Sequence, residues 1–82
     1  MSKEKNEKKF VEAFTGALNI KGKEVVDSLK YQGIPEWDSI SHMVLITNLE
    51  EKFDISIETD DVIDMSSVGK AKKILKKYDI KM

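Results

Sequence analysis

The 82-residue sequence has no cysteine and no arginine, and it has one proline, one histidine and one tryptophan. Without cysteine the chain can form no disulfide, no cysteine-ligated zinc site and no thiol nucleophile of its own. No apolar run approaches the roughly 20 residues that a membrane-spanning helix needs. The mixed-charge start has no apolar segment behind it, which predicts that it is not a signal peptide. We therefore expect a cytoplasmic protein that folds by packing alone, without contact to a membrane.

Hydrophobic residues make up 40% of the chain, which predicts a single small domain over residues 1–82 rather than a disordered tail. The net charge of −1 is unevenly distributed. Residues 31–66 hold nine of the 15 acidic residues, whereas residues 67–82 hold six of the 14 lysines. The acidic middle argues against nucleic-acid binding, because phosphates would be repelled. It suits a basic protein partner, although charge runs are also common on ordinary solvated faces.

The spacing of apolar residues predicts a first helix and a long loop. Phe10, Phe14 and Leu18 recur every four residues, which favours a helix over residues 3–18 with residues 1–8 as a flexible or frayed end. Residues 19–37 lack a period and contain glycine and proline. We expect them to form an ordered loop with a short helical turn at 23–29.

Residues 39–53 carry the strongest helical pattern in the chain. Leu45, Leu49 and Phe53 share one face, together with Ile46 and His42, and Asp38 or Ser39 can cap the start. Two apolar residues, Ile40 and Val44, fall on the outer side of this helix, with Met43 at the edge of the inner face. Beyond it we expect an extended connection at 54–57, a helical turn capped by 59–61 that runs through residue 64, and a last helix over 68–78 capped by Ser66 or Ser67. The class is all-α.

The inventory of reactive residues is poor for catalysis. Ser39 and His42 are neighbours one turn apart, which could begin a nucleophile–base pair. No residue pattern orients the histidine or suggests an oxyanion hole, so we expect no enzyme activity. The acidic stretch 54–64 fails the EF-hand spacing, because Thr59 stands where glycine is needed and Met65 where glutamate is needed. We expect no metal site. Ser39 itself opens a helix, where a phosphate on its hydroxyl would meet free backbone N–H groups.

The segment 37–53 resembles the acyl carrier proteins. Their hallmark is Asp-Ser-Leu at the start of a helix that ends in Leu-Glu-Glu-x-Phe. This sequence has Asp38-Ser39-Ile40 and Leu49-Glu50-Glu51-Lys52-Phe53 at these places. The order and spacing of the later elements agree as well, so that the resemblance covers residues from about 10 to 78.

The resemblance implies a four-helix bundle with a long loop between helices 1 and 2 and a short third helix. It implies that Ser39 carries 4′-phosphopantetheine, transferred from coenzyme A by a phosphopantetheinyl transferase, and that Asp38 helps to place the magnesium-bound coenzyme A. The arm would hold an acyl or aminoacyl group as a thioester and present it to loading and acyl-using enzymes. We expect a monomer whose partners dock on Ile40, Met43, Val44 and Glu51.

The sequence also departs from the fatty-acid carriers of this family. They often have acids two and five residues after the serine, where this chain has Ser41 and Val44. Trp37 and His42 look more like the free-standing carriers of specialised pathways, such as polyketide, aminoacyl or surface-polysaccharide acylation. The alternative is a small helical interaction module that binds its partner through an acidic face and carries no prosthetic group.

Overall fold

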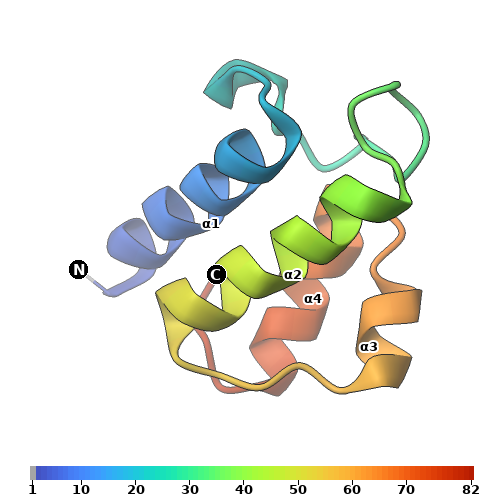
Figure 1. The fold of residues 1–82 in the computed structure, drawn as a ribbon. Helices are drawn as coiled ribbons and strands as arrows, with labels where there is room; N and C mark the ends of the chain where they lie inside the picture. The colour runs from blue at the N-terminus through green and yellow to red at the C-terminus, as the bar shows by residue number, and fades with distance from the viewer. Residues whose placement is uncertain (1) are drawn as a thin grey trace.

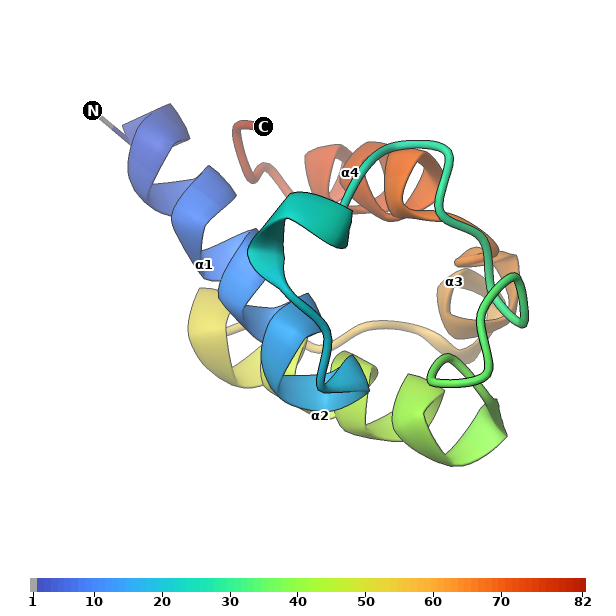
Figure 2. The same cartoon turned by 90° about the horizontal axis from the view of Figure 1, so that it is seen from above.

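The computed structural model describes residues 2–82, and these residues are all-α, as predicted. Their helices, in chain order, are α1 (Ser2–Leu18), the 3-10 turn η1 (Gly22–Glu24), α2 (Ser39–Phe53), α3 (Thr59–Asp64) and α4 (Val68–Lys77) (Figure 1). Within residues 2–82 the extended pairing amounts to an isolated β-bridge between Lys30 and Ser67. Figure 2 shows α2 and α4 on opposite sides of the molecule, with α1 at one end and α3 at the other.

The core lies between these helices and is apolar. It is built from α1, α2 and α4, together with single side chains from the connections. The predicted faces of α1 and α2 are the buried ones, which confirms the helical periods used to place them. The fully buried large side chains are Trp37, Phe10, Phe14, Leu18, Leu45, Leu49, Met65, Leu75 and Val68.

Helix α1 matches the predicted helix over residues 3–18 and begins at Ser2. Its last residue is Leu18. The next residue, Asn19, adopts the left-handed conformation with φ 57° and donates its N–H to the Thr15 carbonyl at 2.9 Å. Asparagine tolerates this conformation better than most residues, so it stops the helix at little cost. Residues 2–8 belong to α1, and the fraying expected there stays a prediction; Met1 lies outside the described residues.

The long connection between α1 and α2 is an ordered loop, as predicted, but its helical turn begins one residue before the predicted 23–29 and is much shorter. The turn is η1 (Gly22–Glu24), and the following residues are extended or bent. Three backbone hydrogen bonds tie the loop to the start of α4. Tyr31 N–H donates to Ser66 O and Val68 N–H donates to Leu29 O, both at 2.9 Å, and Gly69 N–H donates to Asp27 O at 3.1 Å. This pairing to a distant segment gives the loop its order, and periodicity within the loop could not reveal it.

Helices α2 and α4 are each capped by a residue that the sequence predicted, whereas α3 is not. Asp38 caps α2, and the Ser67 hydroxyl caps α4 by accepting from Lys70 N–H at 3.0 Å. Helix α4 ends at Lys77, one residue before the predicted end. The capping role expected of residues 59–61 was wrong, because the N-cap of α3 is Glu58 and its side chain makes no capping bond.

The short helix α3 is held by a buried acid instead of a cap. Asp61 is 5% exposed, and its Oδ1 and Oδ2 accept hydrogen bonds from Lys77 Nζ and the Tyr78 hydroxyl, each at 2.6 Å. The Tyr78 oxygen in turn accepts from Glu58 N–H at 2.9 Å. A six-residue helix is marginal by itself, so these contacts to α4 position it.

Candidate functional site

The start of α2 is built by a reciprocal pair of capping bonds around Ser39. Asp38 Oδ1 accepts from the N–H groups of Ile40 at 3.1 Å and Ser41 at 2.9 Å. The Ser41 hydroxyl oxygen accepts from Asp38 N–H at 2.9 Å. Ser39 lies between these two residues and takes no part in the cap, and its side chain is exposed. The structure therefore leaves the Ser39 hydroxyl open to a reagent from solvent.

Asp38 is an exposed carboxylate that stays ionised. The hydrogen bond from Ser41 N–H lowers the pKa of the Asp38 carboxyl, and the bond from Ile40 N–H adds to the effect. Both backbone bonds end on Oδ1, so Oδ2 of the exposed side chain lies outside them. One expectation from the sequence is wrong here: the N–H groups of Ile40 and Ser41 are not free for a phosphate on Ser39, because Asp38 already occupies them.

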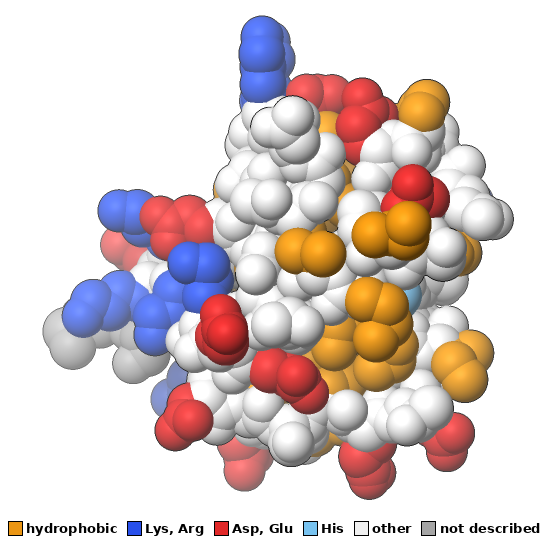
Figure 3. Space-filling model, viewed as in Figure 1, with side chains coloured by type: hydrophobic (Ala, Val, Ile, Leu, Met, Phe, Trp, Pro, Cys, Tyr) orange, Lys and Arg blue, Asp and Glu red, His pale blue; other side chains and the backbone are white. Residues whose placement is uncertain are grey.

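The outer side of α2 carries an exposed apolar surface next to Ser39. Ile40 is 77% exposed, Met43 58% and Val44 44%, and Ile63 of α3 is 75% exposed. We call these four residues the α2–α3 patch. Figure 3 shows hydrophobic side chains gathered over α2 and towards α3, with acidic side chains around them. The exposure predicted for Ile40 and Val44 is confirmed. Met43, expected at the edge of the inner face, is exposed as well, and Ile63 is a member that the sequence did not indicate.

The acidic residues near the patch do not all face outwards. Glu51 is exposed, as expected, and so are Asp54 and Asp60. Asp61 is buried against Lys77 and Tyr78, so it cannot contribute to an acidic outer face. The acidic residues of this segment could not show that the Asp61 side chain is buried, because its partner is Lys77, 16 residues further along.

His42, one turn after Ser39 on α2, connects the end of the loop, α2 and α3. The indole Nε1–H of Trp37 donates to His42 Nδ1 at 2.9 Å, and His42 Nε2 lies 2.9 Å from the carbonyl oxygen of Val62 in α3. The imidazole is 9% exposed and lies 5.1 Å from the Tyr31 ring, centroid to centroid. Because both ring nitrogens have partners, His42 is not available as a base for Ser39. This agrees with its expected role as a packing residue.

Sequence reasoning noted Trp37 only as part of the resemblance and did not predict its burial. It stands at the end of a loop without a period, yet it is 0% exposed. Its ring packs edge-on against Phe14 at 5.4 Å, and its backbone N–H donates to Ile34 O at 3.2 Å. The one available signal was chemical: a lone tryptophan beside a strong helix is a large apolar surface that has to be buried.

A small open hollow lies beside His42, between the loop, α2 and α3. It encloses about 280 Å³. Two of its lining residues are polar hydroxyl side chains, one is the His42 ring and the others are apolar. They are Tyr31, His42, Val62, Ile63, Met65 and Ser66.

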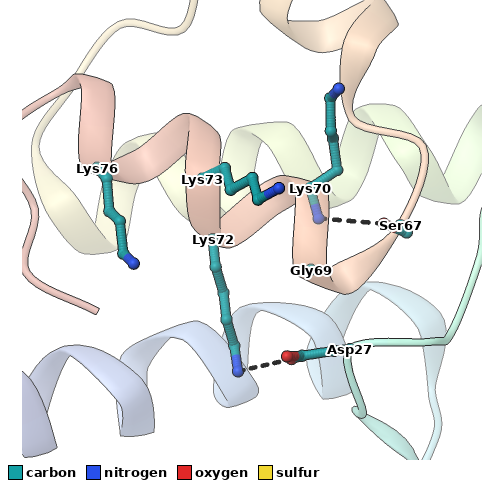
Figure 4. A pocket seen from close by; sticks show the side chains of 7 residues that line it. All are labelled: Asp27, Ser67, Gly69, Lys70, Lys72, Lys73 and Lys76. Carbon is teal, nitrogen blue, oxygen red and sulfur yellow. Dashed lines mark hydrogen bonds and ion pairs between the residues drawn. The ribbon is translucent and has the colours of Figure 1, made fainter.

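A second hollow of about 360 Å³ lies along α4, away from Ser39 (Figure 4). One of its lysines, Lys72, is paired with Asp27 at 2.8 Å, and Lys70, Lys73 and Lys76 surround the opening. Surface lysines around an open hollow attract anions of any kind, so we assign it no specific ligand.

Residues 2–82 contain no group of three or more His, Asp or Glu side chains placed to hold a metal ion. None of the helices in this part of the chain has the length and apolar character needed to cross a membrane.

The comparisons with known proteins do not identify a family. The chain matches no protein-family model, and neither curated proteins nor solved structures give a significant match.

Proposed function

We propose that this protein is an acyl carrier protein whose Ser39 bears 4′-phosphopantetheine and whose surface presents the attached acyl or aminoacyl group to partner enzymes. The observation that carries the proposal is the exposed Ser39 between Asp38 and Ser41 at the first turn of α2, within the motif Asp38-Ser39-Ile40. The four helices and the long ordered loop agree with the bundle that the sequence resemblance implies. That these helices form an acyl-carrier bundle in particular is part of the proposal.

The residues at the start of α2 fit a transferase reaction. With the transferase holding the other groups, the Ser39 hydroxyl oxygen would attack the coenzyme A phosphorus that bears the pantetheine arm. The new O–P bond forms as the phosphoanhydride bond breaks, adenosine 3′,5′-bisphosphate leaves, and the hydroxyl proton goes to a base of the transferase. The cap keeps Asp38 ionised beside it, with one carboxylate oxygen outside the helix hydrogen bonds. An exposed carboxylate oxygen is the kind of ligand that Mg²⁺ prefers, so Asp38 would help to place the magnesium-bound coenzyme A.

The arm would supply the thiol that this chain lacks. When bound, 4′-phosphopantetheine provides a terminal thiol that holds an acyl or aminoacyl group as a thioester. The chain itself contributes position rather than chemistry, because both ring nitrogens of His42 are engaged and the imidazole is not available as a base for Ser39. We therefore assign no catalytic activity to the protein.

Partner enzymes would dock on the α2–α3 patch. The apolar side chains of Ile40, Met43 and Val44 lie within two turns of Ser39, so a partner bound there reaches the arm. Exposed acids nearby, such as Glu51, would attract basic side chains of the partner and speed the encounter. Ser41 and Val44 replace acids that are common in fatty-acid carriers, which favours a specialised acylation pathway.

The test uses the absence of cysteine from the chain. The protein is incubated with coenzyme A, magnesium and a broad-specificity phosphopantetheinyl transferase, freed from small molecules and titrated with a thiol reagent. We expect one thiol per chain in the wild type and none in Ser39→Ala. If several transferases leave the wild type without a thiol, the carrier function is wrong and the alternative, an interaction module that uses the same patch, takes its place.

A further inference from the structure

The hydrogen bonds of His42 fix its protonation as well as its position. An indole N–H is only a donor, so His42 Nδ1 must accept from Trp37. The ring proton is then on Nε2, which donates to the Val62 carbonyl of α3. The neutral imidazole thus bridges the end of the loop, α2 and α3, and its two partners lie on opposite sides of the ring.

Separating α3 from α2 would break this bridge. Helix α3 has six residues and no side-chain cap. The side-chain hydrogen bonds of its Asp61 go to Lys77 and Tyr78, so they attach α3 to α4 rather than to α2. Moving Val62 away would leave His42 Nε2–H without its partner in a site that is 9% exposed. Leaving a buried donor unpaired is more costly than the hydrogen bond is favourable, so the contact resists opening.

We propose that His42 is a latch between α2 and α3 that restricts the cargo to a short acyl or aminoacyl group lying in the open hollow. This inference rests on the proposed carrier function. The hollow is about 280 Å³, below the range of roughly 300–1,000 Å³ typical of pockets that enclose a ligand. The His42 ring lines the hollow, and it is hydrogen-bonded to the fully buried Trp37.

The lining of the hollow agrees with a short group of mixed polarity. Val62, Ile63 and Met65 provide an apolar wall for a few carbon atoms. The hydroxyl groups of Tyr31 and Ser66 are side chains that could pair with an amine or carbonyl of the cargo. A long alkyl chain would not fit there, and it could reach the core only by breaking the latch. His42 is therefore a positioning residue that sets cargo length.

The latch is tested first in the unmodified protein by amide hydrogen exchange. His42→Asn keeps a short acceptor near Trp37 but cannot reach Val62, so amides of α3 should exchange about tenfold faster. Met43→Asn is the matched control, because Met43 is the exposed neighbour on the same helix, and it should leave α3 exchange unchanged. Equal α3 exchange in wild type and His42→Asn would overturn the latch.

Cargo length is tested without a transferase. Ser39→Cys provides the only thiol of the chain, and bromoacetyl pantetheine amides that carry an acetyl or a dodecanoyl group are attached to it. With native His42, we expect both conjugates to give the same methyl resonances for Leu45 and Leu49 and the same α3 exchange. Changes in these core signals with the dodecanoyl group alone would show that the chain enters the core, and would overturn the proposal.

This comparison stands even if His42→Asn does not fold, because it uses native His42. It also separates the two proposals. A failure of Ser39 to accept phosphopantetheine would refute the carrier function and leave the conjugate result unaffected. Entry of the long chain would refute the limit on cargo and leave the carrier function intact.

Discussion

Asp38 and Ser41 cap α2 reciprocally: the carboxylate of Asp38 accepts from Ser41 N–H, and the hydroxyl oxygen of Ser41 accepts from Asp38 N–H, both at 2.9 Å. The Ser41 hydroxyl also donates to Glu36 O at 2.7 Å. Ser41 stands where fatty-acid carriers often have an acid, and in that respect the chain departs from those carriers. In the structure it is the third-position member of a capping box, a place that glutamate or glutamine usually takes.

Removing the Ser41 hydroxyl should therefore weaken the start of α2. We predict that Ser41→Ala lowers the free energy of unfolding by about 1 kcal/mol, because a partly exposed capping bond is lost. Ser41→Glu should recover most of this loss, since glutamate can close the same box. Ser39→Ala is the control and should stay within about 0.5 kcal/mol of wild type, because Ser39 is outside the cap. Urea denaturation measures all three, and a Ser41→Glu variant as unstable as Ser41→Ala would contradict the assignment.

The two sides of α2 should respond differently to truncation. Leu49 is fully buried, so Leu49→Ala should cost roughly 2–5 kcal/mol of unfolding free energy. Val44 lies on the outer side and is 44% exposed, so Val44→Ala should change it by no more than about 0.5 kcal/mol. Thermal unfolding of both variants gives the comparison. Similar losses in the two would mean that the helix face is misplaced.

Acid should destabilise the protein through Asp61. The hydrogen bonds from Lys77 and Tyr78 lower the pKa of the Asp61 carboxyl below its usual 3.8. A carboxyl whose pKa is lower in the folded state stabilises the fold above its unfolded pKa, and this stabilisation is lost as pH falls through the folded pKa. We predict that Asp61→Asn is less stable than wild type at neutral pH, and that the difference shrinks as pH falls below 3.8.

The matched control for this pH series is Asp60→Asn, which removes an exposed acid from the same helix. Denaturation midpoints for the three proteins, measured from neutral pH into the acid range, give the result. A gap between wild type and Asp61→Asn that stays constant with pH would show that the carboxylate charge is not what holds α3 to α4.

Docking on the α2–α3 patch predicts a local effect of a new charge. Val44→Asp should keep the fold, because Val44 is exposed, and should lower kcat/KM of the transferase acting on this protein. Val26→Asp is the control, since Val26 is 49% exposed but lies in the loop before α2. Equal rates for the two stable variants would place docking elsewhere, whereas loss of folding in Val44→Asp would mean that Val44 is needed for packing.

Local patterns predicted the helices well because their information is local. Phe10, Phe14 and Leu18 repeat at the helical period, and Leu45 and Leu49 do the same. Each set has one face to bury, so the segment, its inner face and its exposed residues follow together. The position of Ser39 at the start of α2 followed from the same pattern.

The remaining contacts depend on residues that are distant along the chain. The indole of Trp37 reaches His42, the ring of which reaches Val62 twenty positions later. The sequence alone does not distinguish Asp61 from a surface acid, because Lys77 and Tyr78 come beside it only in the folded chain. No periodicity within one segment predicts such pairs, because they form only when the loop, α2, α3 and α4 pack together.

The central claim is that Ser39, and no other serine, accepts a phosphopantetheinyl group. The most direct measurement is the intact mass of wild type, Ser39→Ala and Ser41→Ala after incubation with coenzyme A, magnesium and a phosphopantetheinyl transferase. We predict that wild type and Ser41→Ala each gain the mass of one phosphopantetheinyl group and that Ser39→Ala gains none. A wild-type mass that several transferases leave unchanged, or a gain that persists in Ser39→Ala, would contradict it.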